Sequence, residues 1–279
     1  MMGDKAMTPL NDSNQAAPLV LRNDSGSIAT ITLNRPQARN ALSRDLMAAL
    51  QDALDQVHDD EAISVVILAA KGPAFCAGHD LKEMRTARGD NDKPDEPFFR
   101  ALFEQCSELM MTIQRLRQPV IAQIEGMATA AGCQLVASCD LAVAAQSAKF
   151  ATPGVNIGLF CSTPMVAVSR AMPRKPVMEM LLTGEPIDAE TAKTYGLINR
   201  VVADDTVAHE TRAIAEQIAA KSPYVLALGK QAFYEQLEHG ISDAYAYTAE
   251  VMTRNMLARD AGEGISAFLD KRPPAWRGE

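Results

Sequence analysis

The sequence has 279 residues, of which 47% are hydrophobic and 22% are charged. Such a chain folds as one large or two small globular domains, which excludes global disorder, collagen-like repeats and a coiled coil. Its 27 Lys and Arg residues face 35 Asp and Glu residues, for a net charge of −8. An acidic chain attracts nucleic acid and anionic lipid poorly, so neither is an expected partner, although a local basic niche can still hold a small anion.

The cysteines and histidines give no sign of disulfides or metal. The five cysteines include no C-x-x-C pair, and the four histidines have no short ligand spacing to them. We therefore expect reduced thiols in an intracellular protein and no metal site. Residues 1–17 are polar, with neither a signal-peptide core nor a transit-peptide composition, and predict a disordered tail on a cytoplasmic protein.

Strand and helix patterns alternate in the first half of the chain. Runs at 19–22 and 28–33 flank a turn and predict a hairpin, and Ser43 is the expected N-cap of a helix reaching Val57. A further helix is expected at 98–117, and apolar strands at 65–68, 120–124 and 141–145. This alternation predicts an α/β fold with βαβ units and one largely parallel, two-faced sheet.

The second half reads as helical. From Pro164 onward helical patterns occupy 164–171, 176–183, 188–195, 206–220, 225–238, 241–258 and a short stretch near 265–269. In the first half, the composition of residues 86–97 predicts a surface loop. We therefore divide the chain into a core at 18–203 and a helical C-terminal region at 204–279. The uncharged run at 150–169 has the length of a membrane span, but its prolines and glycines would break such a helix, so we expect a pocket wall.

Small residues between a strand and a helix start mark two segments. Ala77, Gly78 and His79 precede a helix start at Asp80, and residues 128–132 precede an apolar helix. Backbone N–H groups at a helix start lack partners, so two such groups converging on one oxygen would form an oxyanion hole. Close packing of a core accounts for the same small residues and remains the alternative.

Several ordered motifs resemble the enoyl-CoA hydratase/isomerase (crotonase) superfamily. Residues 75–84 (FCAGHDLKEM) resemble its first signature, and residues 119–140 its second. Later motifs lie at 182–198 and 263–272, so the resemblance runs from about residue 19 to the end. The segments at 130–140 and 150–161 look most like the branch of the third enoyl-CoA-hydratase-domain-containing proteins.

This resemblance implies a crotonase-like ββα spiral core with a C-terminal helical trimerisation region. It also implies an acyl-CoA substrate, with coenzyme A as part of the substrate and no separate cofactor, and self-association as a trimer or hexamer. The backbone N–H groups of His79 and Ala131 would polarise the thioester carbonyl and stabilise an enolate. Ala131 occupies a position where the family usually has Gly.

Two departures bear on the reaction. Hydratases of this family carry Glu at the positions of Gln134 and Gly154. Gln does not exchange a proton at neutral pH and Gly has no side chain, so we expect weak or absent hydration of short enoyl-CoA. An isomerase, thioesterase or decarboxylase on the same fold remains an alternative, as does a non-catalytic acyl-CoA-binding protein.

The resemblance also assigns contacts with the substrate and coenzyme A, at Arg39, Ala41, Ala77, Asp80, Leu81, Gly126, Pro153, Gly158, Lys230, Phe268 and Lys271. Further candidate cations for the coenzyme A phosphates are Arg35, Lys82, Arg85, Arg88 and Arg272. Asp80 is also the expected N-cap of the helix after it. The His79 imidazole could carry acid–base chemistry, but a side chain pointing away from the thioester is the favoured interpretation.

Overall fold

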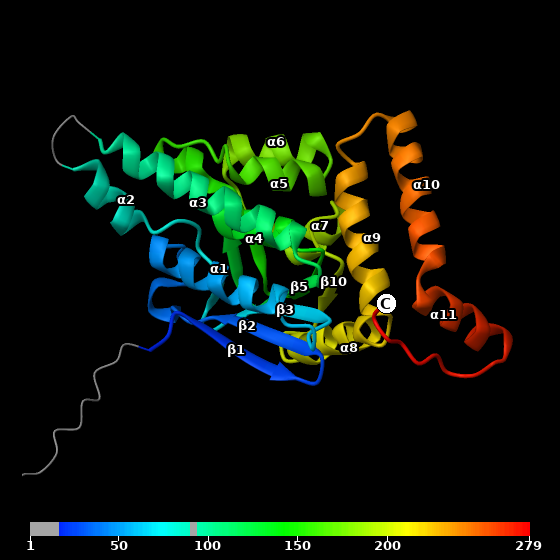
Figure 1. Ribbon diagram of the computed structural model, residues 1–279. Helices are drawn as coiled ribbons and strands as arrows, with labels where there is room; N and C mark the ends of the chain where they lie inside the picture. The colour runs from blue at the N-terminus through cyan, green and yellow to red at the C-terminus, as the bar shows by residue number, and fades with distance from the viewer. Residues whose placement is uncertain (1–16, 90–93) are drawn as a thin grey trace, which may run out of the picture.

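Two β-sheets lie at the centre of the molecule (Figure 1) in the computed structural model, which describes residues 17–89 and 94–279. The larger sheet runs in the order β1 (Val20–Ser25), β2 (Ile28–Leu33), β3 (Val65–Ala70), β5 (Val120–Ile124), β7 (Leu141–Ala145) and β10 (Arg200–Val202). The smaller sheet runs in the order β4 (Ala74–Cys76), β6 (Met127–Thr129), β8 (Lys149–Ala151) and β9 (Ile187–Asp188). The β1–β2 hairpin is antiparallel, as expected, and β2, β3, β5, β7 and β10 are parallel.

From β3 to β8, consecutive strands alternate between the two sheets. β3 is followed by β4, β5 by β6 and β7 by β8, and each pair leads into helix. This confirms the ββα spiral and corrects the expectation of βαβ units on a single sheet. The strands of the smaller sheet were missed because three residues are too few for a hydrophobic period to show.

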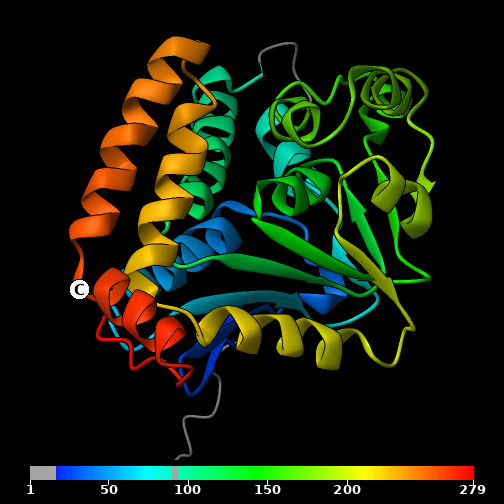
Figure 2. The same ribbon diagram turned by 90° about the vertical axis from the view of Figure 1, so that its right-hand side faces the viewer.

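Helices cover both sheets. They are α1 (Arg44–His58), α2 (Leu81–Arg88), α3 (Glu96–Arg115), α4 (Ala131–Ser138), α5 (Pro164–Ala171), α6 (Arg174–Thr183), α7 (Ala189–Thr194) and α8 (Val207–Ala219). α8 lies beneath the larger sheet and contacts β3, β5 and β7 (Figure 2), which explains why those strands are apolar on both faces. Ser43 caps α1 as predicted, accepting a hydrogen bond from the Leu46 N–H at 3.2 Å.

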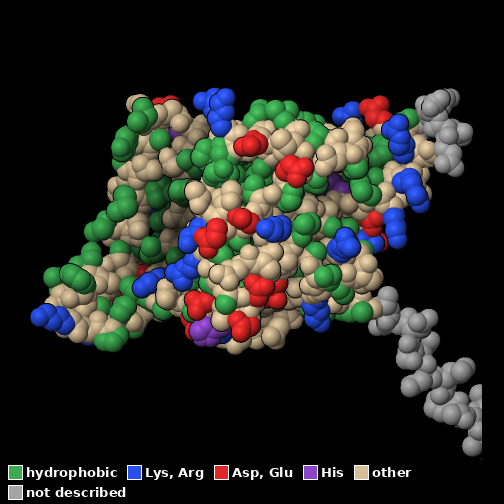
Figure 3. Space-filling model, turned by 180° about the vertical axis from the view of Figure 1, so that it is seen from behind, with side chains coloured by type: hydrophobic (Ala, Val, Ile, Leu, Met, Phe, Trp, Pro, Cys, Tyr) green, Lys and Arg blue, Asp and Glu red, His purple; other side chains and the backbone are tan. Residues whose placement is uncertain are grey.

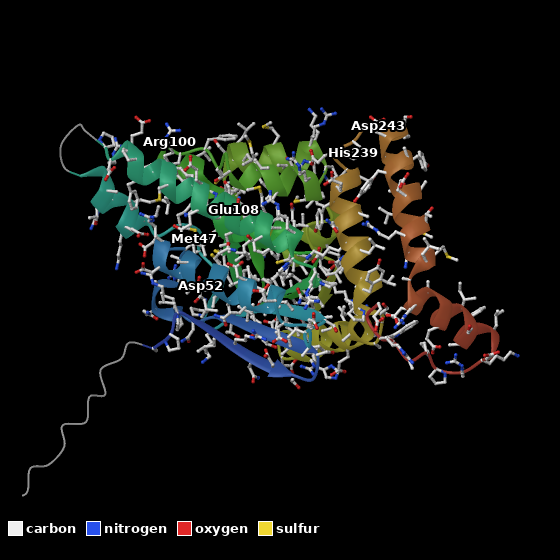
Figure 4. The ribbon with its side chains drawn as sticks, viewed as in Figure 1. Met47, Asp52, Arg100, Glu108, His239 and Asp243 are labelled. Atoms are coloured by element: carbon white, nitrogen blue, oxygen red, sulfur yellow. The ribbon has the colours of Figure 1, made fainter. Side chains whose placement is uncertain are left out.

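Three C-terminal helices stand beside this core: α9 (Pro223–Gln236), α10 (Ile241–Leu257) and α11 (Arg259–Leu269). α9 packs against α3, whereas α10 packs on α9 and α11 projects further outward (Figure 1). His239 lies in the turn between α9 and α10 and Asp243 in the first turn of α10 (Figure 4), and the His239 ring meets Tyr247 edge-on with centroids 5.5 Å apart. The predicted C-terminal helical region is therefore present.

Several predicted boundaries need correction. β9 and β10 lie where only helix was expected, because strands of two or three residues leave no periodic signal. The predicted loop at 86–97 is shorter, since α2 reaches Arg88 and α3 begins at Glu96, while residues 90–93 lie outside the described residues. Of the predicted tail, residues 1–16 lie outside them too. In the described part of the chain, no helix has both the length and the apolar character needed to span a membrane.

Candidate active site

Parallel pairing of β4 with β6 brings the two small-residue segments together. Cys76 pairs with Ala128, so the chain leaves both strands at the same edge of the smaller sheet. A Cβ placed on Gly78 would lie 3.0 Å from the Ala130 Cβ and 3.5 Å from the Ala131 nitrogen. Gly132 approaches β4 so closely that its Cβ would overlap the Cys76 carbonyl oxygen, at 2.1 Å. Segments far apart in the sequence are thus in direct contact.

Within residues 17–89 and 94–279, each segment carries a backbone N–H group without a hydrogen-bond partner. In the parallel bridge between Leu42 and His79, the Leu42 N–H donates to the Gly78 carbonyl and the Asp80 N–H donates to the Leu42 carbonyl. The His79 N–H takes no part in this bridge. Ala131 is the first residue of α4, where an N–H group has no partner within the helix. Among the described residues, neither N–H donates to another backbone carbonyl of a turn or loop. Both groups are therefore available to an oxygen atom of a ligand.

Ala130 holds the second segment in an uncommon conformation. Its φ of 50° and ψ of −117° lie in a region that favours glycine, and its N–H donates to the Ala151 carbonyl at 2.9 Å. This residue turns the chain between β6 and α4. The neighbouring Ala131 has helical geometry, which alanine adopts without strain.

A cavity of 460 Å³ opens beside these N–H groups. Its walls are the residues Ala77, His79, Leu81, Met84, Phe103, Thr129, Ala130, Ala131, Pro153, Gly154, Asn156, Ile157, Leu159, Phe160, Cys161, Ser162, Thr163 and Pro164. The uncharged run at 150–169 supplies much of this wall, as predicted. None of these wall residues is an Asp, Glu, Lys or Arg, so a ligand group held here meets mainly apolar surface.

The titratable side chains of this wall are those of His79 and Cys161. Burial raises the pKa of the Cys161 thiol, so that it stays protonated at neutral pH. Burial lowers the pKa of His79. A hydrogen-bonding interaction with the Leu42 backbone raises this pKa by less than burial lowers it, so the imidazole is neutral at pH 7. His79 is one of the wall residues, its two ring nitrogens are buried and its ring packs edge-on against Phe103; the expectation that the imidazole points away from the thioester stays a prediction.

Gln134 and Gly154 lie in different surroundings. Gln134 is buried in α4, with its side-chain oxygen 3.9 Å from the Cys106 sulfur, and is not part of the cavity wall. Gly154 lies in the wall, where an added Cβ would come within 2.8 Å of the Leu159 carbonyl oxygen and 3.0 Å of the Cys161 sulfur. A larger residue at 154 therefore requires the backbone at Leu159 to move.

Asp80 and Arg35 stabilise the loop that carries the His79 N–H. The Asp80 carboxylate accepts from the Lys82 N–H at 2.9 Å, which confirms the predicted cap of α2, and it lies 2.7 Å from the Arg35 guanidinium. Burial alone would raise the pKa of Asp80, but Arg35 and the Glu83 and Lys82 N–H groups lower it overall. Both side chains already have partners, so we assign them a structural role in place of the predicted ligand contacts.

The remaining assigned residues fall into two groups. Ala77, Leu81 and Pro153 lie in the cavity wall. Arg39, Ala41, Gly126 and Gly158 are not part of it; the Arg39 carbonyl accepts from the Ala77 N–H at 3.0 Å, and Gly126 passes close to Pro73. The predicted contacts of these four residues with the substrate or coenzyme A stay predictions. Wall residues that the sequence analysis missed, such as Met84 and Phe103, lie on helices whose apolar residues serve mainly the core.

Lys230 was predicted to contact coenzyme A, and the structure places it elsewhere. Its ammonium lies 2.7 Å from the Asp140 carboxylate and donates to the Ile113 and Gln118 carbonyls at 2.8 and 2.9 Å. Tyr234 donates to the same carboxylate at 2.9 Å. With its side chain 6% exposed, Lys230 anchors α9 to the core and does not offer a charge to a ligand.

Phe268 and Lys271 lie at the end of α11, away from the cavity wall of their own chain. The Phe268 side chain is 83% exposed. Their predicted contacts with coenzyme A depend on a neighbouring subunit and stay predictions.

Comparison with known proteins agrees with these features. Residues 23–279 match the family model described as enoyl-CoA hydratase/isomerase. The human enoyl-CoA hydratase domain-containing protein 3, mitochondrial, is 47% identical over 90% of this chain and 81% of its own length. A probable enoyl-CoA hydratase of Mycobacterium leprae is 31% identical over 88% of this chain and 93% of its own length.

Solved structures show the same fold. An enoyl-CoA hydratase of Mycobacterium smegmatis is 51% identical with a TM-score of 0.89, covering 93% of this chain and 99% of that one. The human domain-containing protein 3 gives a TM-score of 0.87 at 46% identity, over 92% and 100% of the two chains. The predicted fold and branch are thus confirmed. The predicted cytoplasmic location is contradicted, because the vertebrate relatives of this branch are named as mitochondrial proteins.

Proposed function

The chain belongs to the enoyl-CoA hydratase/isomerase family, and from this premise we propose that it binds acyl-CoA thioesters with the acyl group in the cavity beside His79. The observation that supports the proposal is the close approach of the segments that carry His79 and Ala131, both of which are wall residues of one apolar cavity. A hydrocarbon chain gains free energy on leaving water for such a surface. The thioester would lie at the two N–H groups and the acyl chain beyond it.

The two N–H groups would act as an oxyanion hole. Donors fixed by a β-bridge and a helix start need no rearrangement as negative charge develops on the carbonyl oxygen. Polarisation of the carbonyl makes the proton on the adjacent carbon more acidic and stabilises the resulting enolate. This chemistry is common to several reactions on the same fold.

Ordinary hydration of enoyl-CoA is not part of the proposal. A wall without carboxylates offers no side chain to position water and deliver a proton in the two-carboxylate manner. The buried Gln134 and the crowded Gly154 support this, since the positions where family hydratases carry Glu hold none. We expect crotonyl-CoA turnover far below that of a hydratase, and an ordinary hydratase rate would contradict this part.

Calorimetry with two matched ligands tests the carbonyl contact. Butyryl-CoA and S-butyl-CoA differ only in the thioester carbonyl, so the proposed oxyanion hole should favour butyryl-CoA by about tenfold in Kd, the gain from one or two backbone hydrogen bonds. Equal affinities would contradict the oxyanion hole. Absence of binding for both ligands would contradict the acyl-CoA proposal itself.

A non-catalytic acyl-CoA-binding protein is the second candidate. It is favoured by the same lack of carboxylates in the cavity wall. A panel of saturated, enoyl and branched acyl-CoA thioesters separates the two candidates. Binding without any turnover would favour the second, whereas turnover of one member would favour an isomerase, thioesterase or decarboxylase according to the product.

We also propose that the chain assembles with copies of itself as a trimer or hexamer. Hydrophobic side chains gather on the arm formed by α10 and α11 (Figure 3), and several are more than half exposed in the single chain. Apolar surface of this extent on one face is typical of a subunit interface. The same arm carries Phe268 and Lys271, so their predicted contacts with coenzyme A would be made to a neighbouring subunit.

A further inference from the structure

We propose that Asp260 positions α11 to bind the nucleotide of coenzyme A, by fastening residues 272–279 to the turn between α8 and α9. This role rests on the proposed acyl-CoA function, in which the end of α11 reaches a substrate held by a neighbouring copy of the chain. Asp260 is only 1% exposed, so it is a positioning residue that acts through Phe268 and Lys271. We call residues 272–279 the returning segment and its contacts with Asp260 the clasp.

The carboxylate of Asp260 lies in the first turn of α11 and collects hydrogen-bond donors from two other parts of the chain. It accepts from the Ser222 hydroxyl at 2.5 Å and from the N–H groups of Arg277 and Gly278 at 2.8 and 3.0 Å. Its own N–H donates to the Glu279 carbonyl at 2.9 Å. Hydrogen bonds to an ionised acceptor are stronger than neutral ones. Because Ser222 is the N-cap of α9, one buried carboxylate joins the start of α9, the start of α11 and the returning segment.

Two further contacts fasten the returning segment along its course. The Arg272 guanidinium donates to both carboxylate oxygens of Glu263 on α11, at 2.7 and 2.9 Å. The Trp276 indole N–H donates to the carbonyl of Ala220, the C-cap of α8, at 2.9 Å. A Cβ on Gly264 would lie 3.1 Å from the Trp276 ring, so the ring packs directly on α11. The segment therefore ties α11 to the end of α8.

The clasp matters because α11 projects away from the core. It packs on α10, which itself packs on α9 (Figure 1). At its end Phe268 is 83% exposed, and Lys271 is exposed and forms no ion pair among the described residues. An exposed aromatic ring and a free ammonium group suit a nucleotide, which offers a base for stacking and phosphates for the charge. Holding α11 in place before binding lowers the entropy lost when these two side chains meet a ligand.

Affinity ratios on the full chain test the role of Asp260. S-butyrylpantetheine shares the acyl group, the thioester and the pantetheine arm of butyryl-CoA but lacks the nucleotide, so the ratio of the two Kd values isolates the nucleotide contacts. For the unmodified chain we expect butyryl-CoA to bind at least about tenfold more tightly by calorimetry, as for one hydrogen bond to a charged group. Asp260→Ala should lower this ratio about fivefold or more, the cost of ordering two side chains on binding. The Kd of S-butyrylpantetheine should not change.

Intrinsic fluorescence reports the state of the clasp directly, because Trp276 is the single tryptophan of the chain. In Asp260→Ala its emission should shift to longer wavelength as the indole moves into water, with unchanged circular dichroism. The affinities are compared at concentrations where light scattering gives the variant and the unmodified chain the same mass. Each ratio is taken on one preparation, so a general loss of folded protein cancels from it.

Three more variants separate the clasp from a general effect of substitution. Trp276→Ala removes both the ring on Gly264 and the hydrogen bond to α8, so it should lower the ratio as Asp260→Ala does. Trp276→Phe keeps a ring at this place and should keep most of the ratio. Asp243→Ala removes an exposed carboxylate from the first turn of α10 and should keep all of it.

The outcomes are separable from those of the proposed function. If both thioesters bind the unmodified chain equally, or if Asp260→Ala keeps the full ratio, the positioning role is overturned while acyl-CoA binding stands. Should Asp260→Ala fail to fold, Trp276→Ala decides in the same way. If neither thioester binds, the proposed function fails and this inference fails with it.

Discussion

Ala130 shows how one residue sets the geometry of the candidate site. With φ at 50° and ψ at −117°, it occupies backbone space that costs a residue with a Cβ about 1–3 kcal/mol. The turn it makes directs the chain from β6 into α4 and so places the Ala131 N–H beside the His79 loop. The structure thus accepts strain at the point where the proposed ligand contact is built.

Ala130→Gly should therefore stabilise the protein. Glycine removes the strain at this φ, although its greater freedom in the unfolded chain offsets about 0.4–1 kcal/mol of the gain. We expect a net increase of about 0.5–2 kcal/mol in the free energy of unfolding, measured by urea denaturation. Ala137→Gly, the same change at a helical position of α4, should instead lower it by about 1 kcal/mol. A loss of stability in both variants would contradict the strain at Ala130.

Side-chain roles were harder to predict from the sequence than backbone roles. The motif segments around His79 and Ala131 were identified correctly as neighbours because their small residues and strand–helix order are local signals. Lys230 was misassigned because its partner Asp140 lies on a distant part of the chain, and a charge alone does not reveal its partner. The edge-on contact of the His79 ring with Phe103 likewise joins distant parts of the chain, so the sequence does not reveal it.

At the scale of elements, the start of α2 depends on one carboxylate. Asp80 caps the helix and pairs with Arg35, and the adjacent His79 is a residue of the cavity wall. Asp80→Asn keeps a capping oxygen but removes the charge, so the variant measures the contribution of the ion pair separately from that of the cap. Because the Asp80 side chain is 9% exposed, we expect Asp80→Asn to lower the free energy of unfolding by about 1–2 kcal/mol at pH 7.

The loss of unfolding free energy in Asp80→Asn should become smaller as the pH falls. The pKa of Asp80 is lower in the folded state, so its charge stabilises the fold above the unfolded-state pKa of about 3.9. That contribution disappears as the pH falls through the folded-state pKa. Urea denaturation of wild type and Asp80→Asn at pH 7, 5 and 3 should thus show a difference that shrinks below about pH 4.

A matched variant provides the control for this series. Asp45→Asn changes an exposed carboxylate in the first turn of α1, which makes no comparable ion pair among the described residues. Asp45→Asn should change the free energy of unfolding by no more than about 0.5 kcal/mol at every pH. A pH-independent difference for Asp80→Asn would show that the Arg35 pair contributes nothing to stability.

Element length decided which parts of the fold were predictable. Helices such as α1, α8, α9 and α10 were located within a few residues, because their hydrophobic residues recur over several turns. Strands of the smaller sheet and β10 have too few residues to show alternation, so composition and periodicity predicted one sheet instead of two. The spiral was inferred from the motif resemblance alone.

At the scale of the whole molecule, the arm of α10 and α11 exposes large apolar side chains. In the single chain Leu257 is 82% exposed and Ile241 79% exposed on α10, and Phe268 is 83% exposed on α11. Leaving so many large apolar side chains in water is unfavourable, and a second copy of the chain is the occupant we propose. Assembly would also bring the end of α11 to a neighbour, where Phe268 is predicted to meet the nucleotide.

Leu257→Glu should therefore weaken the assembly and leave the fold intact. Burying an unpaired carboxylate in an apolar interface is costly, whereas in the single chain this side chain is already in water. Size-exclusion chromatography with light scattering should show a trimer or hexamer for the wild type and a shift toward monomer for Leu257→Glu, with unchanged circular dichroism. Lys71→Glu, an exposed change after β3, should leave the assembly as it is. A monomeric wild type would contradict the assembly, and an unshifted Leu257→Glu would move the interface away from this face of α10.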